Sequence, residues 1–185
     1  MQTAALTNSF AILERFGEIL SYPGEDYLQQ VAACRDAALG IDPEAVRCLS
    51  DFNARVCGLT VEEVQELYVQ TFDLNPVCAL EVGWQLYGDN YDRGNFLVKM
   101  RQELERHGVP ENRELPDHIS NVLPLLACMD PSDAMLFAAA SAVPALNKML
   151  AAFEGKNSPY EDVLKALRRI LKSALSNSAE EANHV

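Results

Sequence analysis

Thiols and imidazoles are the side chains of this sequence best suited to bind a transition metal or form a redox centre. The chain has five cysteines and three histidines, but no CxxC, HxxxH or HExxH pair. Zinc, iron–sulfur and haem sites need such spacings, so we expect no metal and no bound cofactor. We expect most of the thiols to be reduced and buried in helix packing; they are Cys34, Cys48, Cys57, Cys78 and Cys128.

Groups for covalent or acid–base catalysis lack their usual partners. The sequence has no GxSxG nucleophile turn, no GxxxxGK[ST] phosphate loop and no GxGxxG motif. The carboxylates of Glu62, Glu63 and Glu66 cluster at the start of a helix, where the helix dipole favours acids without any catalytic role. Cys128 follows His118 by ten residues, which is no evidence for a nucleophile–base pair, and we expect a packed cysteine there. The sequence therefore predicts a protein that is not an enzyme.

Three segments combine aromatic and charged side chains in a way that suits peptide binding: 68–73, 79–94 and 114–118. A helical peptide docks in an apolar trough, and carboxylates at the rim of the trough favour basic residues. The sequence predicts a trough lined by Tyr68, Phe72, Trp84 and Tyr87, with charge supplied by Glu81 and Asp117. The segment 114–118 has a second interpretation, in which Pro116, Asp117 and His118 simply start a helix.

Helices must position these residues, because apolar side chains recur at three- and four-residue spacing almost everywhere. Thr60 and Glu63 have the spacing of a capping box, and Gly108 is placed to end the helix before it. The segment 77–90 is the least regular part. Pro144 predicts a kink or break in a helix over 130–153.

These signals define a single all-α domain. We expect a helical bundle of seven to nine helices over residues 1–175, the last of them over 159–175. The remaining residues, 176–185, are polar, and we expect them to be disordered.

Charge is distributed unevenly along the 185 residues, whose formal net charge is -12. Residues 1–90 hold 14 acids against four arginines, a net of -10, whereas residues 91–185 hold 13 acids against 11 bases, a net of -2. A chain with this much negative charge is poorly suited to bind nucleic acid or an anionic membrane. The acidic first half is either a solvated surface that maintains solubility or a face for a cationic partner.

Targeting and membrane-spanning signals are missing from the sequence. The first positive charge is Arg15, so the N-terminus has no basic n-region. No uninterrupted apolar stretch reaches the ~18 residues that a transmembrane helix needs. We therefore expect a cytoplasmic protein without membrane insertion.

Five short motifs, in order over residues 10–172, resemble those of a known family. They are Leu20-Ser21-Tyr22-Pro23, Tyr68-x-x-x-Phe72-Asp73, Tyr91-x-Arg93-Gly94, Leu115-Pro116-Asp117-His118 and Ser158-Pro159-Tyr160. Together they resemble the redox-enzyme maturation chaperones of the nitrate reductase delta-subunit (NarJ/TorD-like) family. One segment departs from the family pattern, because Cys78-Ala79-Leu80-Glu81 stands where the respiratory nitrate reductase branch tends to have a basic, serine-containing run. That departure leaves the particular client open.

The resemblance implies a helical, non-catalytic chaperone. Such proteins bind the basic N-terminal segment, typically a twin-arginine leader or its remnant, of a molybdenum-cofactor oxidoreductase subunit. They hold this apoenzyme until the cofactor is inserted. The motif residues that the resemblance adds to the predicted client-binding site are Asp73, Arg93, Gly94, Pro116 and His118.

Two other classes of protein stay open at this stage. A permanent, non-catalytic helical subunit of an oxidoreductase complex would share the fold and the acidic surface. A small helical enzyme is disfavoured, because the catalytic motifs are missing. Co-purification separates the first class from a chaperone, since a chaperone is absent from the mature enzyme.

Overall fold

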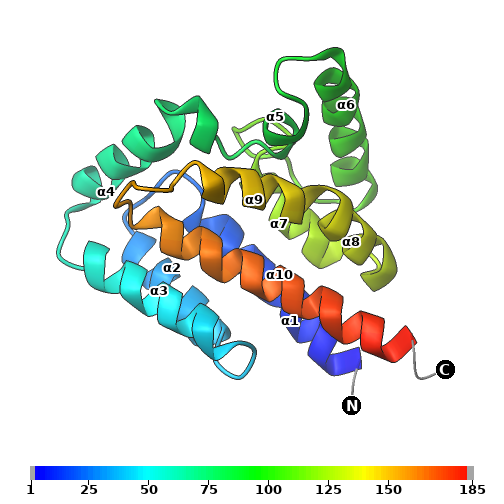
Figure 1. Ribbon diagram of the computed structural model, residues 1–185, viewed down its shortest axis with the longest axis horizontal. Coiled ribbons are helices and arrows are strands. Elements are labelled where there is room, and N and C mark those ends of the chain that lie inside the picture. Colours follow the sequence, from blue (N-terminus) through cyan, green and yellow to red (C-terminus); the bar gives the residue numbers. More distant parts are fainter. Residues whose placement is uncertain (1–2, 183–185) are drawn as a thin grey trace.

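The fold is entirely helical over residues 3–182, for which this computed structural model describes the backbone; side chains are described for residues 11–176. This confirms the predicted all-α class. Figure 1 shows the arrangement of the helices. They are α1 (Thr3–Ile19), α2 (Tyr27–Ala37), α3 (Pro43–Val56), α4 (Val61–Tyr68), η1 (Val69–Asp73), η2 (Pro76–Cys78), α5 (Val82–Tyr87), α6 (Tyr91–Arg106), α7 (Ile119–Cys128), α8 (Pro131–Phe137), η3 (Ala138–Ala142), α9 (Val143–Ala151) and α10 (Tyr160–Ala182).

Helices α1 and α10 form the centre of the bundle. Helix α1 packs against α2, α7 and α10, while α10 also packs against α3 and α9. In Figure 1 the short helix α5 lies above α9, and α6 stands at the edge of the bundle away from α2 and α3. The hydroxyl groups of Tyr27 and Tyr160 meet at 3.1 Å inside the core and join α2 to α10.

Local capping signals place the helix starts where the sequence predicts them. The Thr60 hydroxyl accepts the backbone N–H of Glu63 at 3.3 Å, and the Glu63 carboxylate accepts that of Thr60 at 2.8 Å. Asp42 caps α3 by accepting the N–H of Ala45 at 2.8 Å. The same carboxylate binds both nitrogens of the Arg169 fork at 3.0 Å, which attaches α3 to α10. These contacts are short-range in sequence, except for the ion pair.

The helix that contains Pro144 is not broken there; a π-helical turn precedes the proline instead. The turn η3 (Ala138–Ala142) lies between α8 and α9, directly before Pro144 in the first turn of α9. Proline has no N–H to donate and clashes with the carbonyl four residues earlier, and a π turn relieves both problems by widening the helix. A second π turn, η1, continues α4 up to Asp73.

Two other segments differ from the sequence expectation. The segment 77–90, expected to be irregular, contains the helices η2 and α5. Helix α10 continues to Ala182, so it does not end near 175 as predicted; the last residues of the expected tail, 183–185, lie outside the described part of the chain.

One helical run in the described residues, 131–151, is long and apolar enough to cross a bilayer by length and composition alone. The sequence reasoning found no such stretch. The run includes η3 and Pro144, and it buries Leu146 and Met149 completely in the core. In the bundle, 44% of its most apolar stretch is buried.

Candidate functional site

Two of the three predicted segments meet at the start of α5. Residues Glu81 and His118 form an isolated antiparallel bridge. On either side of it, Val82 donates its N–H to the carbonyl of Asp117 at 2.8 Å, and Ile119 donates to that of Leu80 at 3.0 Å. These backbone bonds fix α5 against the start of α7. The structure thus joins segments that lie more than thirty positions apart, as the contact between Gly83 and Asp117 illustrates.

Asp117 is the buried anchor of this junction. Its side chain is fully buried, its Oδ2 accepts the N–H of Gly83 at 3.1 Å, and the Nε of Arg93 lies 3.6 Å from the same oxygen. Burial raises the pKa of Asp117, although the Arg93 guanidinium acts in the opposite direction. The prediction that Asp117 supplies charge to a trough is therefore wrong in its geometry, because its carboxylate faces the protein interior.

Gly83 is required by this packing. A Cβ atom at position 83 would lie 2.6 Å from Oδ2 of Asp117 and 2.8 Å from Cδ1 of Phe96. Contacts this short do not occur for real Cβ atoms, so any other residue would push α5 away from the carboxylate. Glycine at this position lets the first turn of α5 approach Asp117 closely enough for its N–H to donate.

His118 starts helix α7, which supports the second of its two interpretations. The Nδ1 atom of His118 accepts a hydrogen bond from the backbone N–H of Ser120 at 3.2 Å and one from the Ser120 hydroxyl at 2.7 Å. Because Nδ1 accepts, the neutral ring holds its proton on Nε2. Burial lowers the pKa of His118 to about 4, so the ring is neutral at pH 7. The side chain also borders a surface hollow, so a binding role stays a prediction beside the capping role.

The first hollow, which we call the acidic hollow, has a volume of about 260 Å³. Its wall includes Phe72, Asp73, Glu81, Trp84, Arg93 and Glu114. Partial burial raises the pKa of both Asp73 and Glu81. The Arg93 guanidinium lies over the Trp84 ring at 5.3 Å, and its charge is offset by Asp117. The remaining charges of the wall are therefore negative.

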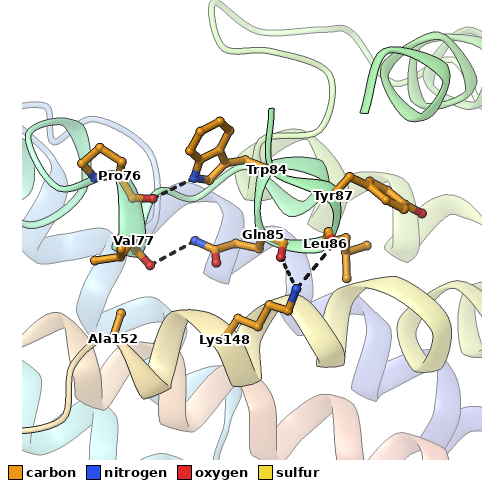
Figure 2. A pocket seen from close by; sticks show the side chains of 9 residues that line it. Pro76, Val77, Trp84, Gln85, Leu86, Tyr87, Lys148 and Ala152 are labelled. Atoms are coloured by element: carbon orange, nitrogen blue, oxygen red, sulfur yellow. Dashed lines mark hydrogen bonds between the residues drawn. The ribbon is translucent and has the colours of Figure 1, made fainter. Parts of the chain in front are cut away.

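The second hollow, which we call the larger hollow, has a volume of about 650 Å³ and shares Trp84 and Pro76 with the first. Figure 2 shows its walls, with Lys148 at the base. The indole N–H of Trp84 donates to the carbonyl of Pro76 at 2.8 Å, which fixes the ring between the two hollows. Sequence reasoning missed Val77, Leu86, Lys148 and Ala152 in this wall, because no local motif points to them.

The four aromatic residues predicted to line one trough lie in three different environments. Tyr68 is buried, donates its hydroxyl to the Leu20 carbonyl at 3.2 Å and packs edge-on against Phe72. It lies beneath the surface, because its position in α4 faces the core. Phe72 reaches the acidic hollow, and Tyr87, which packs on Phe96, reaches the larger one. The single trough is thus replaced by two hollows that meet at Trp84.

Two further motif residues, like Tyr68 and Asp117, stand outside the described walls of both hollows. Gly94 is exposed in the first turn of α6, and a Cβ atom there would meet nothing within 4 Å. Pro116 is buried directly before Asp117, where its rigid backbone leads into the junction. The structure supports a positioning role for Pro116 and shows none for Gly94.

The thiols are distributed differently from the expectation. Cys34, Cys48 and Cys78 are buried, but Cys57 and Cys128 are exposed. The expectation of a packed Cys128 is wrong, because this residue ends α7 on the outer surface. Within the described residues, no three His, Cys, Asp or Glu side chains lie close enough together to hold a metal ion.

This all-helical fold is that of redox enzyme maturation proteins. The solved structure of a protein assigned to that class, from Archaeoglobus fulgidus, superimposes with a TM-score of 0.60 over 86% of this chain and 91% of that one, at 24% identity. The family model for the nitrate reductase delta subunit matches residues 41–177. The chain belongs to this family, which confirms the resemblance found in its motifs.

Curated relatives of the chain are assembly chaperones. The nitrate reductase molybdenum cofactor assembly chaperone NarJ of Escherichia coli is 24% identical over 163 residues, covering 86% of this chain and 69% of NarJ. The probable chaperone of the same kind, NarW, is 24% identical over 169 residues, covering 91% of this chain and 71% of NarW. A family of assembly chaperones is not a family of enzymes, so the prediction of a non-catalytic protein is confirmed.

Proposed function

We propose that this protein is a cytoplasmic chaperone for a molybdenum-cofactor oxidoreductase. It binds the basic N-terminal segment of the catalytic subunit, a segment of the twin-arginine type, and holds the apo form for cofactor insertion and assembly. NarJ and NarW are both named for molybdenum cofactor assembly, which supports the class of client. The charge of the acidic hollow supports the choice of a basic segment.

The observation that supports this function most strongly is the combination of negative charge and aromatic surface in the acidic hollow. Asp73, Glu81 and Glu114 border it, and the one arginine in its wall is already offset by a buried carboxylate. A cationic side chain of the client gains favourable electrostatic energy there, and its apolar stem packs beside Trp84.

Energies measured at known protein interfaces indicate how much of the binding free energy comes from the aromatic residues and how much from the carboxylates. A buried aromatic anchor contributes about 2 kcal/mol or more on truncation. A carboxylate at a solvated rim contributes about 1 kcal/mol or less and acts mainly on the association rate. The aromatic walls are therefore expected to determine most of the affinity, whereas the carboxylates select a basic client and make binding sensitive to salt.

The test is a titration with a synthetic peptide that comprises the N-terminal segment of the molybdoenzyme catalytic subunit. Trp84 is the only tryptophan, so its fluorescence reports directly on this site. Replacing the three rim carboxylates together (Asp73→Asn, Glu81→Gln and Glu114→Gln) should weaken binding at about 0.1 M salt by about 10- to 100-fold, from up to about 1 kcal/mol each.

The matched control removes the same charge from exposed acids elsewhere, with Glu14→Gln, Glu25→Gln and Glu105→Gln. Long-range charge alone should change the affinity by less than about threefold, because the Debye length is about 10 Å at moderate salt. Equal losses in the two triple variants, or no loss in the first, would show that the acidic hollow does not receive the peptide.

The alternative, a permanent helical subunit of an oxidoreductase complex, is favoured only by the family description, which names a delta subunit. The two functions predict different amounts of this protein in the mature enzyme. A permanent subunit is present in one copy per mature enzyme, whereas a chaperone is found with the apo form and leaves before the enzyme matures.

A further inference from the structure

The larger hollow differs from the acidic hollow in the sign of its charge. Lys148 is the one charged residue among the described residues of its wall. The wall beside it is largely apolar, and two of its side chains are well exposed, Val77 at 58% and Tyr87 at 40%. These two side chains leave apolar surface exposed to solvent beside the hollow.

The charge of Lys148 is held in a fixed place. Its Nζ donates to the carbonyl oxygens of Gln85 at 2.7 Å and of Leu86 at 3.4 Å, as Figure 2 shows. These carbonyls belong to the last turn of α5, where unpaired C=O groups favour a cation. The positive charge therefore stays at the base of the hollow.

Hydrogen bonds also fix the side walls of the larger hollow. The Gln85 amide donates to the carbonyl oxygens of Val77 at 3.2 Å and Ala79 at 2.9 Å, which ties α5 to η2. Together with the bond from Trp84 to Pro76, these contacts hold the walls in place before any partner binds. A preformed site lowers the entropy lost on binding.

We propose that the larger hollow is a second subsite for the client, which takes apolar side chains and rejects cationic ones. This inference rests on the proposed function, since its occupant is the apolar face of the same basic segment. Trp84 then separates a subsite for a cationic side chain from one for apolar side chains. Lys148 determines specificity, because its fixed charge repels a basic residue placed on the wrong side of Trp84.

Size and continuity support this assignment. A volume of about 650 Å³ leaves room for more than one aliphatic side chain. The two hollows share the walls formed by Trp84 and Pro76. An amphipathic segment with its cationic group in the acidic hollow therefore places its neighbouring apolar residues at the larger one.

The first test uses two synthetic peptides of equal length and charge and the fluorescence of Trp84. One has a pair of arginines followed by a leucine-rich helical turn, and the other has serines in place of those leucines. Val77→Asp puts a carboxylate against the apolar wall. It should therefore weaken binding of the leucine peptide by about tenfold and binding of the serine peptide by less than about twofold. Leu74→Asp is the matched control, because Leu74 is 74% exposed nearby and is not part of the described wall.

The outcomes of this titration distinguish a failure of the apolar subsite from a failure of the proposed function. If the unaltered protein binds the leucine peptide no more tightly than the serine peptide, or if Val77→Asp weakens both peptides equally, the apolar subsite is wrong while the proposed function stands. If the unaltered protein binds neither peptide, the proposed function fails and the subsite fails with it.

The second test addresses Lys148 directly. A third peptide has arginine in place of one leucine, and Lys148→Gln removes the charge but keeps a donor for the Gln85 carbonyl. The unaltered protein should prefer the leucine peptide to the arginine peptide, and this preference should fall by about fivefold in the variant, as expected for one like-charge contact near the surface. An unchanged ratio of the two affinities would overturn the role of Lys148.

Discussion

The Nε of Arg93 lies 3.6 Å from Oδ2 of Asp117, and this pair joins the first turn of α6 to the start of α7. The carboxylate also binds α5 through the N–H of Gly83. Three helices thus converge on one fully buried side chain, whose Oδ1 has no hydrogen-bond partner in the described part of the chain. Part of the electrostatic cost of burying Asp117 is offset by Arg93, and the same attraction holds the Arg93 guanidinium beside Trp84.

Removing the charge of Asp117 should therefore destabilise the fold. We expect Asp117→Asn to lower the free energy of unfolding by about 3 kcal/mol, since it leaves Arg93 partly buried without its counter-charge. Urea denaturation followed by circular dichroism measures this loss. The double variant with Arg93→Met should regain part of the lost stability, because it removes the unpaired charge. If Asp117→Asn is as stable as the parent protein, the buried pair has no anchoring role.

The close approach at Gly83 gives a second prediction. Gly83→Ala should cost about 1–3 kcal/mol, because the new methyl group meets both Asp117 and Phe96 and α5 must shift. Gly94→Ala is the control: its site is open, and alanine in a helix interior should stabilise by up to about 1 kcal/mol. Thermal or urea unfolding of the two variants measures the difference. Equal stabilities would contradict the packing around α5.

His118 predicts a dependence of stability on pH. Its pKa in the folded protein is about 4, below the unfolded value of 6.5, so the unfolded state binds more protons between these values. Its contribution to stability is present above pH 6.5 and is lost as the pH falls towards 4. Between pH 7 and pH 5 the loss from this group should be about 2 kcal/mol.

The variant His118→Asn tests this pH dependence, because asparagine can still cap α7 but does not titrate. Its stability should fall less than that of the parent protein between pH 7 and pH 5. A His118→Asn variant with the parent's full acid sensitivity would show that other groups determine it.

The thiols should react in two classes. Burial raises the pKa of the Cys34, Cys48 and Cys78 thiols, whereas Cys57 and Cys128 are exposed. A thiol reagent at neutral pH should therefore modify Cys57 and Cys128 quickly and the other three only after unfolding. We also expect normal client binding after replacement of Cys57 and Cys128 by serine. Loss of binding with an intact fold would reveal a redox or metal role.

Sequence reasoning predicted the features of this fold that depend on neighbouring residues. The capping box at Thr60 satisfies backbone groups within three positions, so the pattern is sufficient to find it. The apolar spacing gave the all-α class for the same reason. Helix α5 was missed because its six residues are too few to establish a period. The hydrogen bonds that anchor it are made with Pro76, Asp117 and Lys148, two of which are distant in sequence.

The candidate site was predicted only in part, because burial depends on tertiary packing. Tyr68 and Trp84 are both aromatic residues of motif-like segments, yet Tyr68 faces the core and Trp84 divides two hollows. Asp117 looked like a surface acid and is completely buried. Lys148 follows Gln85 by 63 positions and stands in an apolar helix without a motif, so no local pattern places it in the wall.

The most direct test of the proposed function is purification of the tagged protein from its native cells, with mass spectrometry of the proteins that remain bound. We predict the catalytic subunit of a molybdenum-cofactor oxidoreductase in its apo form. The subunit should be largely lost with the triple variant at Asp73, Glu81 and Glu114 and retained with the control triple variant. The mature enzyme should lack the protein. A preparation without any molybdoenzyme subunit, or a mature enzyme that contains this protein in one copy per catalytic subunit, would contradict the proposed function.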